Sequence, residues 1–313
     1  MTQAQNSFAG WHVAQLNVGR LVAPLDSPEL ADFVANLDPV NGLADASPGF
    51  VWRLQDDSGS ATSIDTFDDP TVIVNLSMWQ SIDALKAFVY QGIHRDVLRR
   101  RGEWFQAEPI TNVVAWWVPA GHIPTPEEAR QRLDFRRAYG PTSHGFDLAN
   151  PLPPLWFERT SLDDPAAQEL IGELNAELAS AYPAPGANHF GLTDAELAPG
   201  VGTFLVGRLD GVPVACGAMR SIAPGFGELK RMYTRPIGRG KRIAASLVAQ
   251  LEAEAVALGL SELCLETGPT SHGAIRLYER ARFTYCAPWG EYVLTPQSSY
   301  CMRKTLRVPH ALD

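Results

Sequence analysis

The chain has 313 residues, of which 45% are hydrophobic and 19% are charged, and this composition excludes a disordered or collagen-like protein. Lysine and arginine number 26 against 35 acidic residues, for a formal net charge of −9. This balance argues against a nucleic-acid partner or an anionic membrane, because such binders need clustered positive charge. The N-terminus lacks a signal-peptide pattern and no apolar run reaches about 18 residues, so we expect a cytoplasmic protein. The four cysteines lack metal-site spacing, which predicts no bound metal.

A proline-rich segment, residues 148–156, divides the chain. Its three prolines favour extended backbone and carry no amide proton. We therefore predict two domains, residues 1–150 and 151–313, each long enough to bury a core. The first holds 11 basic and 18 acidic residues (net −7) and the second 15 and 17 (net −2). Most basic residues of the second lie between Lys230 and Arg282, and such a cluster indicates an anionic ligand.

Strand and helix patterns alternate in the first half. The order strand, helix, strand, strand, helix, strand predicts a split βαβ, ferredoxin-like α+β sheet. Helices cover one face of such a sheet, so we expect the bare face to be buried in a homodimer. The helices should begin after Ser27, Ser81 and Thr125, each followed by helical spacing or by proline and acids. The second is predicted to be one long helix, in which apolar residues recur every three or four positions from Leu85 to Leu98. The predicted strands are residues 11–22, 50–54, 71–79 and 112–118.

The second half predicts an α/β domain with a mixed sheet. Asp210-Gly211 between two β-rich runs indicates a hairpin, and Gly259 should end a helix. We expect two further strands at the C-terminal end of the domain. The other predicted strands are residues 156–159, 202–209, 212–221, 227–234 and 263–266, and the predicted helices are 165–182, 240–258 and 274–281.

The stretch 228–244 carries the most chemical information. It runs from a strand through a turn rich in proline, glycine and arginine into an amphipathic helix. Unpaired amides at such a helix start, together with the helix dipole, form an anion site. A Walker A motif is excluded, because Gly-Lys lacks the following Ser or Thr, and the Rossmann fingerprint is absent. Basic residues raise the positive potential at this turn: Arg235, Arg239, Lys241 and Arg242.

Residues 220–306 resemble the GNAT N-acetyltransferase superfamily. The resemblance implies an acyltransferase that moves acetyl from acetyl-CoA to an amine of a small molecule, directly within a ternary complex. The matching pieces are, in chain order, Glu228-Leu-Lys-Arg-Met-Tyr-Thr-Arg-Pro, Arg239-Gly-Lys-Arg-Ile-Ala, Leu263-Cys-Leu-Glu-Thr, Ala274-Ile-Arg-Leu-Tyr-Glu-Arg-Ala-Arg-Phe and Gly290-Glu-Tyr.

The same resemblance implies a role for each matched residue. Glu228 would take the proton of the amine, and Tyr278 would protonate the departing thiolate. Backbone groups of Met232, Tyr233 and Thr234 would bind the pantetheine arm and the thioester oxyanion. Glu291 and Tyr292 are candidates to face the acceptor amine. The residues of the turn would cradle the pyrophosphate: Arg239, Gly240, Lys241, Arg242, Ile243 and Ala244.

Two arginines stand where the family places glycine. Arg242 either adds a phosphate contact or blocks the cradle with its side chain. Arg282 follows a helix end that often requires a left-handed backbone, at a cost of about 1 kcal/mol for a non-glycine residue. An alternative hypothesis therefore assigns ligand binding or oxygenase-type or haem-type chemistry to the first domain, and the second domain is then a degenerate CoA-binding module. A dimeric scaffold without activity is a third.

Residues 8–146 resemble the dimeric α+β barrel superfamily, which includes antibiotic-biosynthesis monooxygenases, and within it an uncharacterised family. The pieces are Ala14-Gln-Leu-Asn, Asp38-Pro-Val-Asn, Pro48-Gly-Phe-Val-Trp-Arg-Leu and Val74-Asn-Leu-Ser-Met-Trp. His94 is either a structural histidine or a haem ligand. Polar and aromatic residues of the domain are suited to line a small-molecule cavity: Asn17, Asn41, Trp52, Arg53, Asn75, His94 and Trp104.

Overall fold

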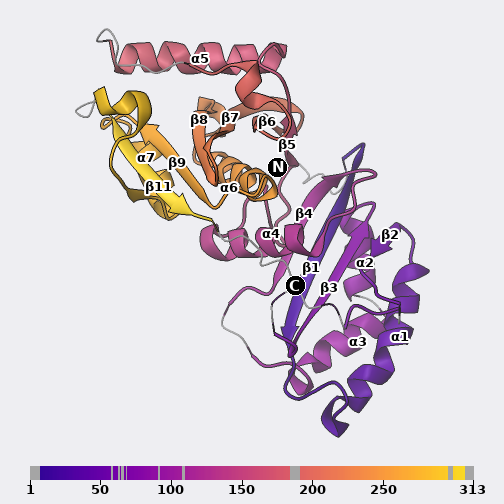
Figure 1. Cartoon of the computed structure of the whole chain (residues 1–313). Helices are drawn as coiled ribbons and strands as arrows, with labels where there is room; N and C mark the ends of the chain where they lie inside the picture. Colours follow the sequence, from indigo (N-terminus) through magenta and orange to yellow (C-terminus); the bar gives the residue numbers. More distant parts are fainter. Residues whose placement is uncertain are drawn as a thin grey trace. The chain divides into compact units, whose positions relative to one another are not determined.

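The computed structural model describes residues 8–57, 59–62, 64, 67, 69–90, 92–107, 110–183, 191–294 and 299–306. Most of the N-terminal stretch that lacks a signal-peptide pattern lies outside them. The chain forms two compact units, Met1–Pro154 and Leu155–Asp313. Their division falls in the proline-rich segment, close to the predicted boundary (Figure 1).

The N-terminal unit contains an antiparallel four-stranded sheet in the order β2-β3-β1-β4. The edge strand β4 is apolar at successive positions, and five of its consecutive residues are buried, so this strand is covered on both faces. The strands are β1 (Trp11–Arg20), β2 (Phe50–Arg53), β3 (Val72–Trp79) and β4 (Val113–Pro119).

The helices of this unit are α1 (Ala31–Asp45), α2 (Ile82–Tyr90), α3 (Gly92–Arg100) and α4 (Pro126–Tyr139), with short 3-10 turns η1 (Pro28–Leu30) and η2 (Arg101–Glu103). The expected cap of α4 is confirmed, since the Thr125 hydroxyl accepts the amide of Glu128. The prediction of one continuous helix after Ser81 is wrong. Gly92 has φ +56°, a left-handed conformation that divides the segment into α2 and α3 although the apolar spacing continues.

Both faces of the sheet are covered by the chain itself. On one face Trp117 packs with Leu85 of α2. On the other, Trp116 packs with Leu133 of α4, and partly buried side chains of the segment between β2 and β3 join them. The expected bare face is therefore absent from the described unit, because α4 folds back over the side that was predicted to await a partner.

The residues expected to line one cavity lie apart. Trp52 packs on the face covered by α4, whereas Asn17 and Asn75 are cross-strand partners exposed on the opposite face. Trp104 is buried against Phe33. The ring of His94 packs on Phe88, and its Nδ1 lies 3.0 Å from the Val89 carbonyl oxygen. These are the contacts of a structural histidine. Arg53 binds Asp45, and Asn41 lies on α1.

The C-terminal unit is built on a seven-stranded mixed sheet in the order β10-β11-β9-β8-β7-β6-β5. Neighbouring strands are antiparallel except β8 and β9, which are parallel. The strands are β5 (Leu155–Arg159), β6 (Gly202–Leu209), β7 (Val212–Ala223), β8 (Phe226–Thr234), β9 (Glu262–Thr267), β10 (Thr284–Tyr285) and β11 (Tyr300–Thr305).

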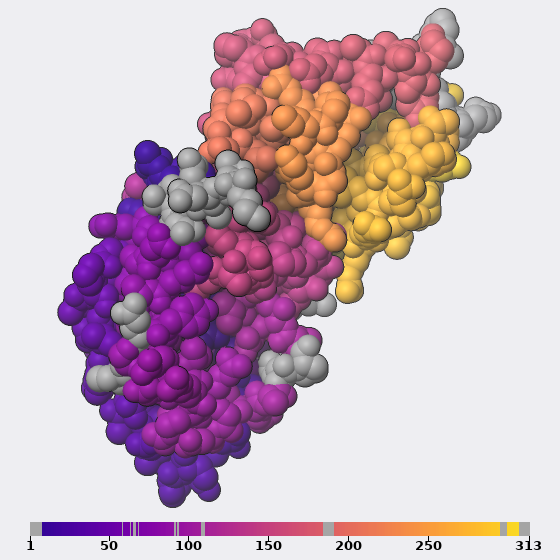
Figure 2. Space-filling model, turned by 180° about the vertical axis from the view of Figure 1, so that it is seen from behind, coloured from indigo at the N-terminus to yellow at the C-terminus, as the bar shows by residue number. Residues whose placement is uncertain are grey.

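Helices cover both faces of this sheet. Helix α5 (Pro165–Ala181) lies on one face over β7 and β8, and α6 (Ile243–Ala257) and α7 (His272–Arg280) pack on the other (Figure 1). Figure 2 shows α5 in pink against the orange part of the same unit. Short 3-10 turns are η3 (Asp194–Leu197), η4 (Pro236–Gly238) and η5 (Gly290–Leu294). Within the described residues, no helix is long and apolar enough to cross a membrane, and no cluster of side chains is suited to a metal.

Both predicted helix ends of this unit have the expected geometry. Gly259 follows α6 with φ +75°, and Arg282 follows α7 with φ +68°. At α7 the amide of Arg282 donates to the Glu279 carbonyl and that of Phe283 to the Tyr278 carbonyl, while the two aromatic rings pack together. This is a Schellman motif whose left-handed position usually holds glycine.

A buried polar cluster ties α4 to the end of the N-terminal unit. The guanidinium of Arg132 lies 3.1 Å from Nδ1 of His144 and donates to the carbonyl of the same residue. Glu128 accepts from Arg132 and from the Trp116 indole. Burial, followed by the neighbouring Arg132, holds the pKa of His144 well below its usual range.

We expect Arg282→Gly to stabilise the C-terminal unit by about 1 kcal/mol, because glycine adopts a left-handed backbone without the Cβ strain. Native-state hydrogen exchange of α6 and α7 amides reports this unit by itself. The matched control is Arg280→Gly, inside α7, which should cost about 1 kcal/mol. An equal loss of stability of the C-terminal unit in both variants would show that the backbone of Arg282 is not strained.

The free energy of unfolding of the N-terminal unit should hold steady from pH 8 to about 6.5 and fall below that. The unfolded His144 takes up a proton near its ordinary pKa, whereas the folded one, with its lowered pKa, does not. Urea unfolding followed by tryptophan fluorescence measures this, since six of the eight tryptophans lie in this unit. His144→Gln should reduce the slope of the free energy of unfolding against pH below about 6.5. Part of the fall in the free energy of unfolding should remain in this variant, because burial also lowers the pKa of His94. An unchanged slope in H144Q would contradict the assignment.

Candidate active site

The two parallel strands β8 and β9 separate part of the way along their length. They pair from Phe226 with Glu262 to Leu229 with Leu265. Beyond that point no pairing between them continues in the described residues, although β8 stays paired with β7 and β9 with β11. A wedge therefore opens between the strands, and the backbone of β8 from residue 230 onward borders it without a strand partner on that side.

A bulge in β8 marks the start of this wedge. Cys216 pairs with Tyr233 and Ala218 with Lys230, so that two residues of β8, at 231 and 232, stand opposite Gly217 alone. The first of the two, Arg231, has φ +58°. A Cβ on Gly217 would lie 2.5 Å from the sulfur of Met232, so glycine is needed for this close approach. The bulge thus redirects β8 at the point where β9 leaves it.

The turn after β8 leads into α6 with glycine-like backbone angles. Gly240 has φ +78° and Arg242, the N-cap residue, has φ +61°. No side chain caps the helix among the described residues, so the amides of Ile243 and Ala244 at its first turn have no side-chain acceptor there. Arg242 thus already adopts the left-handed backbone that favours glycine. Its side chain and that of Lys241 are exposed.

Acidic residues of α5 neutralise the other two cations predicted at the turn. Glu169, Glu173 and Glu177 recur every four residues and share one helix face. Arg235 binds Glu169 and Glu173, each at 2.8 Å, and Arg239 binds Glu177 at 2.6 Å. Nε of Arg239 also donates to the carbonyl of Thr234, one of the residues predicted to border the pantetheine arm. The sequence did not indicate this pairing, because the acids lie about 60 residues earlier in the chain.

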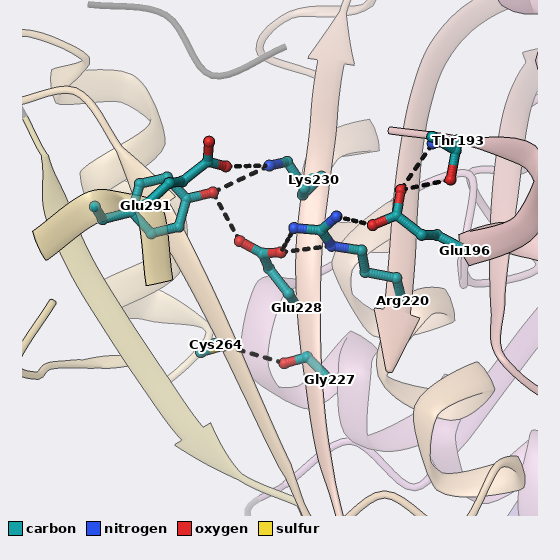
Figure 3. A network of polar contacts seen from close by, with 9 residues as sticks. Thr193, Glu196, Arg220, Gly227, Glu228, Lys230, Cys264 and Glu291 are labelled. Atoms are coloured by element: carbon teal, nitrogen blue, oxygen red, sulfur yellow. Dashed lines mark hydrogen bonds and ion pairs between the residues drawn. The ribbon is translucent and has the colours of Figure 1, made fainter. Parts of the chain in front are cut away.

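Glu228 lies at the centre of a buried network on the α5 face of the sheet (Figure 3). Its side chain is 1% exposed and is therefore shielded from solvent. Arg220, its cross-strand partner in β7, contacts it at 2.5 Å and 2.7 Å, and also binds Glu196 of η3. The hydroxyl of Tyr292 donates to Oε1 of Glu228 at 2.7 Å. Sequence reasoning missed Glu196 and Arg220, which carry no local motif.

Lys230 continues the network on the same face. Its ammonium is buried, 3.2 Å from Oε1 of Glu291 and 3.2 Å from the hydroxyl of Tyr292. Burial, followed by the charge and hydrogen bond of Glu228, raises the pKa of Tyr292 well above its usual range. Tyr292 therefore keeps its proton at neutral pH and acts as a donor to Glu228. The structure thus joins Tyr292 to Glu228 and Glu291 to Lys230, whereas their predicted position facing the acceptor amine stays a prediction.

Tyr278 lies on the other side of the sheet, on α7. It is buried in the core that α6 and α7 share with β8 and β9, against Phe283. Burial, followed by nearby Glu266, raises the pKa of Tyr278 above its usual range, so the phenol stays protonated. Glu228 and Tyr278 thus occupy opposite faces of the sheet near the wedge.

Known proteins match both units. The family described as "Acetyltransferase (GNAT) family" matches residues 168–283, and the family described as "Domain of unknown function (DUF3291)" matches residues 12–162. The chain is 38% identical over 156 residues to the IAA acetyltransferase of Azospirillum brasilense, covering half of this chain and all of the relative. It is 33% identical over 91 residues to the uncharacterized N-acetyltransferase YsnE of Bacillus subtilis (strain 168), covering 28% of this chain and 60% of the relative.

Solved structures of acetyltransferases also resemble the chain. A GNAT family acetyltransferase from Elizabethkingia anophelis with acetyl-CoA bound is 15% identical, with a TM-score of 0.37, and covers 49% of this chain and 98% of its own. The PaiA N-acetyltransferase from Thermoplasma acidophilum in complex with coenzyme A is 17% identical, with a TM-score of 0.39, and covers 48% and 98%.

The family match and the relatives confirm the predicted acyltransferase and acetyl-CoA as its co-substrate. The N-terminal domain carries the DUF3291 match, whose function is unknown. Through its C-terminal domain, the chain belongs to the GNAT family of N-acetyltransferases.

Proposed function

We propose that the C-terminal unit transfers acetyl from acetyl-CoA to an amine of a small molecule, in one ternary complex. The observation that carries the proposal is the wedge between β8 and β9. It opens at the bulge next to buried Glu228 and is followed by the uncapped start of α6. The thioester arm occupies the wedge along the backbone of residues 232–234, and the pyrophosphate meets the amides of residues 243 and 244.

The transfer needs two proton movements. The amine nitrogen attacks the thioester carbonyl carbon, so that a C–N bond forms and the C–S bond breaks. Glu228 takes the amine proton through the Tyr292 hydroxyl, since that hydroxyl covers its Oε1. Tyr278 returns a proton to the departing thiolate, for which its raised pKa keeps the phenol protonated.

For the N-terminal unit, the ferredoxin-like fold is supported by the antiparallel order β2-β3-β1-β4, whereas the barrel, which needs the sheet of a second copy, stays a prediction. The homodimer and the cytoplasmic location stay predictions. The bare sheet face that motivated the homodimer is already filled by α4, so a dimer would have to use another surface of this unit.

Glu228→Gln should lower kcat about 10²- to 10⁴-fold and leave the Kd for acetyl-CoA unchanged, because Gln keeps the volume but accepts no proton. Steady-state CoA release and calorimetric titration measure the two quantities. The control is Glu252→Gln, which removes an ion pair with Lys304 outside the network. Full turnover in E228Q would remove Glu228 from the chemistry. Absence of acetyl-CoA binding in the unchanged protein would overturn the proposed function itself.

Arg242→Gly should raise the Kd for acetyl-CoA about tenfold, because the left-handed backbone is already in place and the change removes a charge beside the phosphates. Calorimetric titration measures it. Arg282→Gly is the matched control, since it also removes a left-handed arginine but lies outside the turn. Tighter binding by R242G would show instead that the arginine side chain obstructs the cradle.

A further inference from the structure

We infer that the acceptor carries a carboxylate close to its amine and that Lys230 binds this carboxylate in the place now taken by Glu291. This inference rests on the proposed function and names the substrate class for the same site. An α-amino acid is the smallest acceptor of this kind.

The first support is the burial of Lys230. Its side chain is only 5% exposed, and a buried ammonium is costly without an anionic partner. Among the described residues, Glu291 is the acid within ion-pair distance of Lys230, at 3.2 Å, and its side chain is 48% exposed. The pair therefore joins a fixed, buried cation to a carboxylate at the surface. Glu291 is thus the exposed member of the pair, whereas Lys230 needs another anion wherever Glu291 leaves it.

The second support is the charge balance of the rest of the network. Glu228 is matched by Arg220, which also binds Glu196. The partner of Lys230, in contrast, is the exposed Glu291. Lys230 is therefore the cation of this network to which an acceptor carboxylate can bind.

The third support is position. Lys230 follows Glu228 by two residues on β8, so both side chains lie on one face, and it directly precedes the bulge at Arg231. The hydroxyl of Tyr292 contacts both Lys230 and Glu228. A carboxylate on Lys230 therefore places an amine one carbon away beside the hydroxyl that leads to Glu228.

A different role for Glu291 makes the opposite prediction. If Glu291 instead bound the acceptor ammonium directly, the acceptor would need the Glu291 carboxylate and not the Lys230 ammonium. The two possibilities differ in the sign of the effect of Glu291→Gln on the KM for the acceptor.

The experiment compares amino acids with the amines that remain when the carboxyl group is removed: leucine with 3-methylbutylamine, phenylalanine with 2-phenylethylamine, and alanine with ethylamine. CoA release with acetyl-CoA gives kcat and KM for each. We expect kcat/KM to be at least about tenfold higher for the amino acid of the preferred pair. Lys230→Met should remove this preference by raising the KM for the amino acid, and Glu291→Gln should lower that KM.

Lys304→Met is the matched control. Lys304 also pairs with a glutamate, Glu252, but on the α6 face of the sheet, and its replacement should leave the preference intact. If K230M does not fold, the KM of E291Q and the comparison of the substrate pairs still test whether the acceptor carboxylate is bound. Equal or better turnover of the plain amines, or a raised KM in E291Q, would overturn the inference.

Failure of the inference and failure of the proposed function give different results. Turnover of amines without preference for a carboxylate overturns only the inference. If neither amino acids nor amines release CoA, the proposed function is overturned, and thermal shifts with the same compounds then test the carboxylate site directly. A shift with leucine but not with 3-methylbutylamine, lost in K230M, would support the site. No shift with any amino acid would overturn it.

Discussion

The extra residue that β8 holds opposite Gly217 is the constraint on which the C-terminal site depends. Without it, β8 would remain straight and its parallel pairing with β9 could continue to the end of both strands. The left-handed backbone of Arg231 costs about 1 kcal/mol or more. Its guanidinium donates to Asn175 of α5, and Met232 fills the space left by the glycine. The bulge is thus supported from both faces of the sheet.

The charged groups next to the bulge form an alternating series from η3 to η5. Glu196, Arg220 and Glu228 make its first half, and Tyr292, Lys230 and Glu291 its second. Buried charges are tolerated only when each has a partner, so this order holds two short turns, about a hundred residues apart in the chain, against the neighbouring strands β7 and β8. Side-chain exposure is lowest at Glu228 and highest at the end of the series, where Glu291 is half exposed. The series therefore combines a buried acid, Glu228, with an exposed one, Glu291.

Local sequence patterns predicted the features that depend on a few neighbouring residues. The Thr125 cap, the left-handed ends at Gly259 and Arg282, and the strand-to-helix turn at 239–242 each follow from backbone rules that act within one turn. The break at Gly92 was missed, because hydrophobic spacing continues across it.

What the sequence could not predict depends on contacts between distant segments. The packing of α4 over the supposedly bare sheet face is one such case, since an amphipathic helix does not indicate which surface it will cover. The partners of Glu228 are another, because Arg220 and Glu196 show no spacing relative to it until the strands are paired. The resemblance proposed Glu228 as a reacting residue, but only the folded sheet shows that its side chain is shielded from water.

The acidic face of α5 has a consequence for the rate at which anions reach the turn. Glu169, Glu173 and Glu177 cancel the field of Arg235 and Arg239, so a polyanion in solution experiences little attraction beyond a Debye length, about 8 Å at physiological salt. The exposed side chains of Lys241 and Arg242 still attract an anion, so encounter with the turn depends on ionic strength, but less than all four predicted cations together would require. Differences in affinity between ligands at this turn accordingly reside in how slowly they leave.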